Sequence, residues 1–87
     1  MAAYKLLLKA TAAKEIEAVG TKVDRQRIVK RIQSLAVDPR ATGSEKIAGY
    51  DDRYRIRQGQ YRIVYRIDDE RHAVTIFKIG YQKEVYR

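Results

Sequence analysis

The chain has 87 residues, the length of one domain, and its 19 Lys and Arg against 11 Asp and Glu give a formal net charge of +8. It has no Cys, which excludes disulfides, thiolate metal sites and a cysteine nucleophile. No apolar run approaches the length of a membrane span, and the first residues lack the pattern of a signal peptide. We expect a cytoplasmic protein whose partner is anionic: nucleic acid, an anionic membrane surface or an acidic protein.

The first twenty residues predict a strand followed by a short helix. Residues 4–9 form a short apolar run, which is typical of a strand. Thr11 can cap a helix over residues 12–19 and Gly20 can end it, because a side-chain oxygen suits the first position and a glycine suits the last.

A second, longer helix is predicted over residues 25–36. Asp24 can cap its first turn, and the Asp38-Pro39 pair can end it because the residue before a proline avoids the helical region. Three apolar residues recur at helical spacing and predict a buried side: Ile28, Ile32 and Leu35. The opposite side carries four basic residues: Arg25, Arg27, Lys30 and Arg31. Residues 40–49, which contain Lys46, are polar and are expected to form a loop.

From Arg53 onward the residues alternate with a period of two, which predicts strands. Gly59 and Gln60 can form a two-residue hairpin turn with glycine at its first central position. That turn pairs Gln58 with Tyr61, Arg57 with Arg62, Arg55 with Val64 and Arg53 with Arg66. Opposite residues share a face. One face then holds five arginines, which we call the arginine strip: Arg53, Arg55, Arg57, Arg62 and Arg66. The other face is mostly apolar.

The remaining residues predict one more strand. Residues 68–71 form a charged turn, and residues 73–79 are apolar on both sides, which is typical of an interior strand. Gly80 is expected to interrupt that strand before the chain ends with residues 81–87. The order is an N-terminal strand, two helices and a three-strand antiparallel meander. This order predicts an α+β domain with the helices packed on one face of a single sheet.

The arginine strip predicts a polyanion site. Arg57 faces Arg62 and Arg53 faces Arg66, and such pairs repel each other unless an anion lies between them. Arginine suits phosphate because its planar fork binds two oxygens at once and stacks on bases. Tyr81 and Tyr86 can add stacking on single-stranded nucleic acid. The alternative is a solvated face whose charges are all positive.

The residues offer little conventional chemistry. His72 is the one histidine, and an exposed turn residue is its simplest interpretation. Three acids, Asp68, Asp69 and Glu70, are consecutive and lack the spacing of a known metal loop, so we expect no metal and no cofactor. A metal-free ribonuclease remains possible because RNA carries its own nucleophile, the 2′-hydroxyl. Arginines can then offset the developing charge, and Tyr86 can move a proton.

The chain resembles the RelE/ParE superfamily of bacterial and archaeal toxins, nearest its RelE branch, over essentially its whole length. The resemblance lies in residues 46–49 (KIAG), residues 54–69 (YRIRQGQYRIVYRIDD), Gly80 and residues 84–87 (EVYR). It implies a compact, microbial-RNase-like fold with two N-terminal helices on an antiparallel sheet. It also implies a metal-independent endoribonuclease that enters the ribosomal A site and cuts mRNA by 2′-hydroxyl attack.

The resemblance further implies the partners of this protein. A cognate, RelB-like acidic antitoxin would wrap the toxin and block its basic site. The complex would repress its own operon, so operator DNA would be bound only through that complex. The remaining partners would be the ribosome, with its rRNA, and mRNA. No membrane is involved.

The site residues follow from the same resemblance. Arg55 and Arg57 match the family's basic residues on the first hairpin strand. Arg62 matches the family's transition-state arginine, and Tyr86 matches its C-terminal tyrosine, which activates or orients the 2′-hydroxyl. Many relatives have His-Arg where this chain has Tyr81-Gln82. Glutamine is a poor proton donor, so Lys83 is the nearest substitute. The expected RNA contacts are Arg53, Arg66, Lys46, Tyr81 and Gln82.

Two other functions remain open from the sequence. One is a ParE-like inhibitor of DNA gyrase that does not cut RNA. The other is a catalytically weak toxin whose main role is operator repression with its antitoxin. In each case the antitoxin is expected to insert a helix into an apolar groove or to add a strand to a sheet edge, with its acids on the arginine strip.

Overall fold

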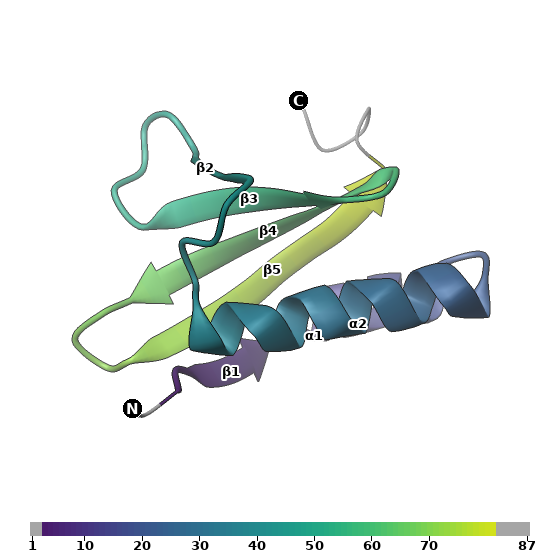
Figure 1. Ribbon diagram of the computed structural model, residues 1–87, viewed down its shortest axis with the longest axis horizontal. Helices are drawn as coiled ribbons and strands as arrows, with labels where there is room; N and C mark the ends of the chain where they lie inside the picture. Colours follow the sequence, from purple (N-terminus) through teal and green to yellow (C-terminus); the bar gives the residue numbers. More distant parts are fainter. Residues whose placement is uncertain (1–2, 82–87) are drawn as a thin grey trace.

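The computed structural model describes residues 3–81, which form two helices and a five-stranded sheet (Figure 1). The elements in chain order are β1 (Lys5–Leu8), α1 (Ala10–Glu17), α2 (Lys22–Val37), β2 (Ser44–Lys46), β3 (Arg53–Gln58), β4 (Tyr61–Asp68) and β5 (Ala73–Tyr81). The strand order is β1-β5-β4-β3-β2, in which β1 runs parallel to β5 and the other pairs are antiparallel. Both helices cover one face of this sheet, so the predicted α+β class is confirmed.

The predicted register of the β3–β4 hairpin is confirmed. All four expected pairs are present: Gln58 with Tyr61, Arg57 with Arg62, Arg55 with Val64, and Arg53 with Arg66. Gly59 has φ +61, the positive value that the first central position of this turn requires and that glycine adopts without strain. The register turns the arginines to the face of the sheet that the helices leave uncovered.

Helix α2 begins earlier than predicted because a different residue caps it. The hydroxyl of Thr21 accepts a hydrogen bond from the Asp24 backbone N–H at 3.1 Å, so Thr21 is the cap. Asp24 lies in the first helical turn, where its charge favours the positive end of the helix dipole. The predicted end is confirmed, since α2 stops at Val37 with Asp38 as its C-cap.

Helix α1 is also displaced from its predicted range, because Thr11 lies inside the helix and does not cap it. Strand β1 ends at Leu8, opposite Ile76, so the rest of the β5 edge has no neighbouring strand there. Side chains of α1 occupy that edge. The Thr11 hydroxyl donates to the Phe77 carbonyl at 3.4 Å, and the Glu15 carboxylate accepts from the Ile79 N–H at 3.0 Å.

Two further expectations about the strands are wrong. The expected loop over residues 40–49 contains β2, which pairs with β3 and forms an edge of the sheet. Gly80 does not interrupt the last strand, since β5 continues to Tyr81 and Gly80 pairs with Arg62. A bulge does interrupt the β4–β5 ladder at Val64/Tyr65, where β5 carries one extra residue, Phe77.

The core lies between the helices and the sheet. The helices contribute Ala12, Ile28, Ile32 and Leu35, and the connection between them contributes Val19. The strands contribute Ile56, Tyr61, Ile63, Tyr65, Ile67, Val74, Ile76 and Ile79. The three apolar residues predicted for the buried side of α2 are all in this cluster. Tyr65 is fully buried, and its hydroxyl donates to the Pro39 carbonyl at 2.6 Å. Over residues 3–81, neither helix combines the length and apolar character needed to cross a bilayer.

Candidate functional site

The arginine strip lies across β3 and β4 near the middle of the sheet. Arg57 stands opposite Arg62, Arg53 stands opposite Arg66, and Arg55 stands opposite Val64. On its other side, Arg62 pairs with Gly80 of β5, which has no side chain. The register therefore brings together all five arginines that the sequence assigned to one site.

Arg62 is buried, although the sequence predicted an outward-facing and therefore wet side chain. Its exposed fraction is 4%, and it is the one charged side chain classed as buried within residues 3–81. The period-two pattern correctly predicted the face on which Arg62 lies. It carried no information on how much that face is covered. Of the five arginines in the strip, Arg62 has the least exposed side chain.

Acidic and aromatic side chains offset much of the repulsion expected within the arginine strip. Arg66 Nε lies 2.6 Å from Asp52 Oδ2, and Arg55 Nη2 lies 3.8 Å from Glu45 Oε2. The Arg53 guanidinium lies over two rings, 4.8 Å from the centroid of Tyr50 and 4.6 Å from that of Phe77. The Arg53–Arg66 pair therefore needs no external anion between its members, whereas for the Arg57–Arg62 pair that expectation stays a prediction.

Arg57 is the most available cation of the strip. Its side chain is exposed, and its Nε donates to the Gly59 carbonyl at 3.1 Å, which fixes it beside the hairpin turn. No acid within residues 3–81 forms an ion pair with it. An arriving phosphate can therefore bind Arg57 without displacing any carboxylate of the described residues.

Two expected RNA contacts lie on the other face of the sheet. Lys46 pairs with Tyr54, and Tyr81 pairs with Tyr61, and both of these partners belong to the apolar face. The Tyr61 and Tyr81 rings stack with centroids 4.9 Å apart. The Tyr81 hydroxyl, followed by burial, raises the pKa of Tyr61, which keeps that phenol protonated at neutral pH. Gln82, Lys83 and Tyr86 lie outside the described residues.

A second polar cluster, absent from the predictions, fixes the loop that follows α2. Arg40 Nη2 lies 2.9 Å from Asp69 Oδ2, and the Tyr4 hydroxyl donates to Asp69 Oδ1 at 2.8 Å. The hydrogen bonds from Arg40 and Tyr4 hold the pKa of Asp69 below its usual range. His72 stacks on Tyr4 with ring centroids 3.8 Å apart. Asp69 and His72 are exposed turn residues, as the sequence predicted. Their contacts with Arg40 and Tyr4 were not predicted, because no local pattern links residues so distant in the chain.

The acids of the strip were also missed as a group. Glu45 lies in β2, within the residues 40–49 that were expected to form a loop, and Asp52 lies between β2 and β3. Within the part of the chain that the structure describes, no three His, Asp or Glu side chains gather in a way that could hold a metal ion. The arrangement as a whole is a cationic face with internal counterions, suited to binding and polarising a phosphodiester.

Comparison with known proteins adds a family and several relatives. A family model described as the ParE toxin of the type II toxin–antitoxin system, parDE, matches residues 6–86. The mRNA interferase toxin RelE of Escherichia coli (strain K12) is 33% identical over 88 residues, with 97% of this chain and 90% of the relative covered. Toxin RelE of Mycobacterium tuberculosis (strain ATCC 25618 / H37Rv) is 29% identical over 84 residues, with 97% and 87% covered.

Solved structures agree with the fold described above. The isolated E. coli RelE toxin superposes with a TM-score of 0.78 at 32% identity, covering 97% of this chain and 92% of that one. The toxin of the intact E. coli RelBE toxin–antitoxin complex superposes with a TM-score of 0.77 at 31% identity, covering 91% of this chain and 96% of that one. An archaeal RelE–RelB complex from Pyrococcus horikoshii OT3 superposes with a TM-score of 0.82 at 21% identity, covering 92% of this chain and 96% of that one. At this identity the similarity supports the fold alone.

Proposed function

This chain belongs to the RelE/ParE superfamily of type II toxin–antitoxin toxins, and on that premise we propose that it inhibits translation by cutting mRNA in the ribosomal A site. The observation that carries the proposal is the arginine strip, with the buried Arg62 and the exposed Arg57 paired beside the hairpin turn. An E. coli relative at 33% identity is an mRNA interferase toxin, which supports mRNA cleavage as the proposed reaction.

The strip suits the charge that develops when a 2′-hydroxyl attacks the neighbouring phosphate. That attack places additional negative charge on the phosphate oxygens, and guanidinium groups held beside them stabilise it. Arg62 is held by burial and Arg57 by its bond to the Gly59 carbonyl, so neither needs to be ordered when substrate arrives. Arg55 is proposed to bind the same RNA phosphates, and its Nη2 lies 3.8 Å from Glu45 Oε2. Preorganisation of this kind is where enzymes gain most of their electrostatic stabilisation.

The proton transfers are assigned to residues outside the described part of the chain. We assign Tyr86 to the 2′-hydroxyl and Lys83 to the leaving oxygen, beside Gln82. Tyr61 is the buried first residue of β4, next to Arg62. Its pKa is raised, so it is a poor general base. The nucleophile comes from the RNA itself, so the reaction as proposed requires no metal ion.

We also propose a cognate antitoxin for this chain. Similar toxins have been solved in complex with RelB antitoxins, including the E. coli RelBE complex at 31% identity. An acidic, RelB-like partner would neutralise the strip by placing carboxylates where RNA phosphates bind. Operator DNA would be bound by the complex and not by the toxin alone.

Inhibition of DNA gyrase is the second candidate, because the family model that matches residues 6–86 is described as a ParE toxin. The two functions separate in one set of reactions. Purified protein is incubated with mRNA, with and without programmed ribosomes, and the 5′ ends are mapped by primer extension. The same preparation is added to a gyrase supercoiling reaction. Ribosome-dependent cuts without gyrase inhibition are expected, and the reverse pattern would replace the nuclease by the gyrase inhibitor.

A further inference from the structure

Helix α2 has more basic residues than any other helix or strand of the described structure, and none of them forms an ion pair within residues 3–81. Five of its residues are basic, Lys22, Arg25, Arg27, Lys30 and Arg31, and one is acidic, Asp24. Within residues 3–81 the ion pairs involve Arg40, Arg55, Arg66, Arg71 and Lys78, and none involves a base of α2. Two arginines of the strip have acidic partners, whereas the bases of α2 have none among residues 3–81.

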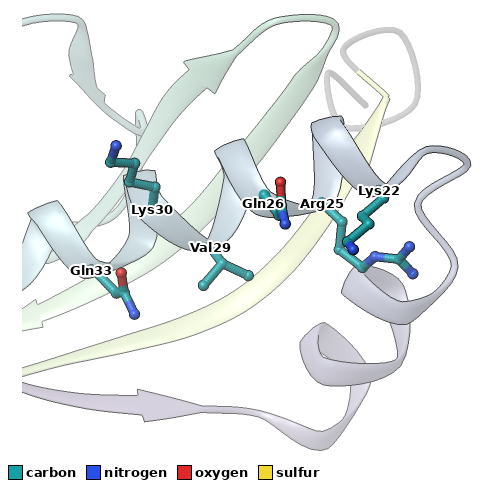
Figure 2. Close-up of a pocket in the computed structure, with 6 residues that line it drawn as sticks. All are labelled: Lys22, Arg25, Gln26, Val29, Lys30 and Gln33. Atoms are coloured by element: carbon teal, nitrogen blue, oxygen red, sulfur yellow. The ribbon is translucent and has the colours of Figure 1, made fainter.

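These bases line two adjoining hollows on the outer side of α2. The first has a volume of about 500 Å³ and is lined by Lys22, Arg25, Gln26, Val29, Lys30 and Gln33, all from this one helix (Figure 2). The second, of about 360 Å³, is lined by Arg27, Lys30, Arg31, Ser34 and Gln58. Lys30 borders both hollows. Arg31 Nε donates to Gln58 Oε1 at 3.1 Å, which joins the basic side of the helix to the end of β3.

The placement of these charges works against the helix itself. Arg27 has like charges three and four residues later, at Lys30 and Arg31, and such neighbours repel on a helix surface. Lys22 and Arg25 lie near the N-terminus, where the helix dipole disfavours cations, and the last turn has no basic residue. Helix stability therefore does not explain the pattern, whereas an external polyanion does.

We propose that the outer side of α2 is a second RNA-binding surface, which holds the phosphate backbone of a structured, double-helical RNA. The proposal rests on the proposed function and extends it: the arginine strip binds mRNA, and α2 binds an RNA helix of the ribosome. The helices cover one face of the sheet and the strip lies on the other (Figure 1), so both surfaces can be occupied at once.

The chemistry of the surface favours RNA over the other anionic partners. A membrane-surface helix needs an exposed apolar side, but Ile28, Ile32 and Leu35 of α2 are buried in the core. An acidic peptide helix would need an apolar groove, but Val29 is the only apolar residue that lines either hollow. A phosphate backbone needs cations at intervals, and the interleaved Gln26 and Gln33 can donate to phosphate and 2′-hydroxyl oxygens.

A charge-matched pair of variants tests this surface. One carries Lys22→Gln, Arg25→Gln and Lys30→Gln, and the control carries Lys5→Gln, Lys14→Gln and Arg71→Gln, which removes the same charge from exposed positions elsewhere. Affinity for a short, fully paired RNA duplex is measured by fluorescence anisotropy over a range of KCl concentrations. Circular dichroism melting checks both folds. If the triple variant does not fold, the single variant Lys30→Gln replaces it, because Lys30 borders both hollows.

The expected result is a loss of affinity specific to the α2 variant. Its affinity at low salt should fall about tenfold or more below that of the control. The slope of log affinity against log KCl concentration should become shallower by about 2 to 3, because each cation removed eliminates one phosphate contact. Equal duplex binding by the two variants would overturn the proposal. Loss of binding to a poly-glutamate peptide, with duplex binding unchanged, would overturn it in favour of an acidic protein partner. The duplex measurement involves no cleavage, so its outcome is independent of whether the nuclease proposal holds.

Discussion

Arg62 and Gly80 stand directly opposite each other on β4 and β5, and the Arg62 side chain is 4% exposed. Gly80 therefore places no side chain of β5 beside Arg62. In the register, Arg62 lies opposite Arg57 at the hairpin-turn end of the arginine strip. This places a buried positive charge next to the exposed Arg57, where the reacting phosphate is proposed to lie.

Substitution of Arg62 should separate charge from geometry. Arg62→Lys keeps the charge but loses the planar fork, and we expect mRNA cleavage on ribosomes to fall about 10²–10³-fold, as when one transition-state donor is removed. Arg62→Ala should lose cleavage and also lower the melting temperature, because it removes a buried side chain. Single-turnover cleavage and thermal melting measure the two effects. Cleavage by Arg62→Lys at the parental rate would remove Arg62 from the proposed site.

Arg57→Gln should weaken RNA binding without changing stability. The side chain is exposed, so the free energy of unfolding should stay within about 0.5 kcal/mol of the parent. Loss of one phosphate contact should lower the salt slope of single-stranded RNA binding by about 1. Arg71→Gln, at an exposed turn position, is the control. If the two variants bind RNA alike, then Arg57 does not contact phosphate.

Removal of an internal counterion should strengthen RNA binding. Asp52→Asn releases Arg66, whose Nε lies 2.6 Å from the carboxylate, and so increases the positive charge of the strip. We expect tighter RNA binding with a steeper salt slope. Because both side chains are half exposed, the loss of folding stability should be at most about 1 kcal/mol. Asp51→Asn removes the same charge from the neighbouring residue, and equal gains in the two variants would mean that the release of Arg66 has no specific effect.

The cap of α2 can be tested through folding stability alone. Thr21→Ala should lower the free energy of unfolding by about 0.5–2 kcal/mol, because it removes the acceptor of the Asp24 N–H. Thr42→Ala, at an exposed position in the loop after α2, is the control. Chemical denaturation measures both variants. Asp24→Ala should cost less than Thr21→Ala, since Asp24 contributes only through the helix dipole, and the opposite order would restore Asp24 as the cap.

Acid should weaken the Arg40–Asp69 contact. The hydrogen bonds from Arg40 and Tyr4 lower the pKa of Asp69 in the folded state, so its stabilising effect is present above the unfolded pKa of about 4 and is lost as the pH falls through the folded value. The difference in melting temperature between the parent and Asp69→Asn should therefore be largest near neutral pH and shrink in acid. A difference that is constant from pH 7 to pH 3 would contradict this interpretation.

Much of the fold was predictable because local patterns dictate it. The β3–β4 register follows from the nearly complete alternation of arginines with apolar residues and from Gly59 at the turn, and all the predicted pairs are present. The buried side of α2 follows from helical spacing. Strand β2 was missed because Ser44–Lys46 is a three-residue polar segment without alternation, held only by its pairing to β3.

What the sequence could not predict depends on contacts between distant segments. Alternation assigned Arg62 to the correct face but could not predict that it is covered. The Asp52–Arg66 and Arg40–Asp69 contacts join residues 14 and 29 positions apart, and no periodic pattern links them. Both Thr21 and Asp24 are good cap residues, and only the geometry of the first turn decides between them.

The most direct test of the proposed nuclease is primer extension on an mRNA incubated with the purified protein, with and without ribosomes paused at a known codon. The parent protein should produce new 5′ ends at the A-site codon only when ribosomes are present, and Arg62→Lys should produce far fewer at the same ribosome occupancy. Absence of cuts on ribosomes that bind the protein, or equal cutting of free mRNA, would contradict the account.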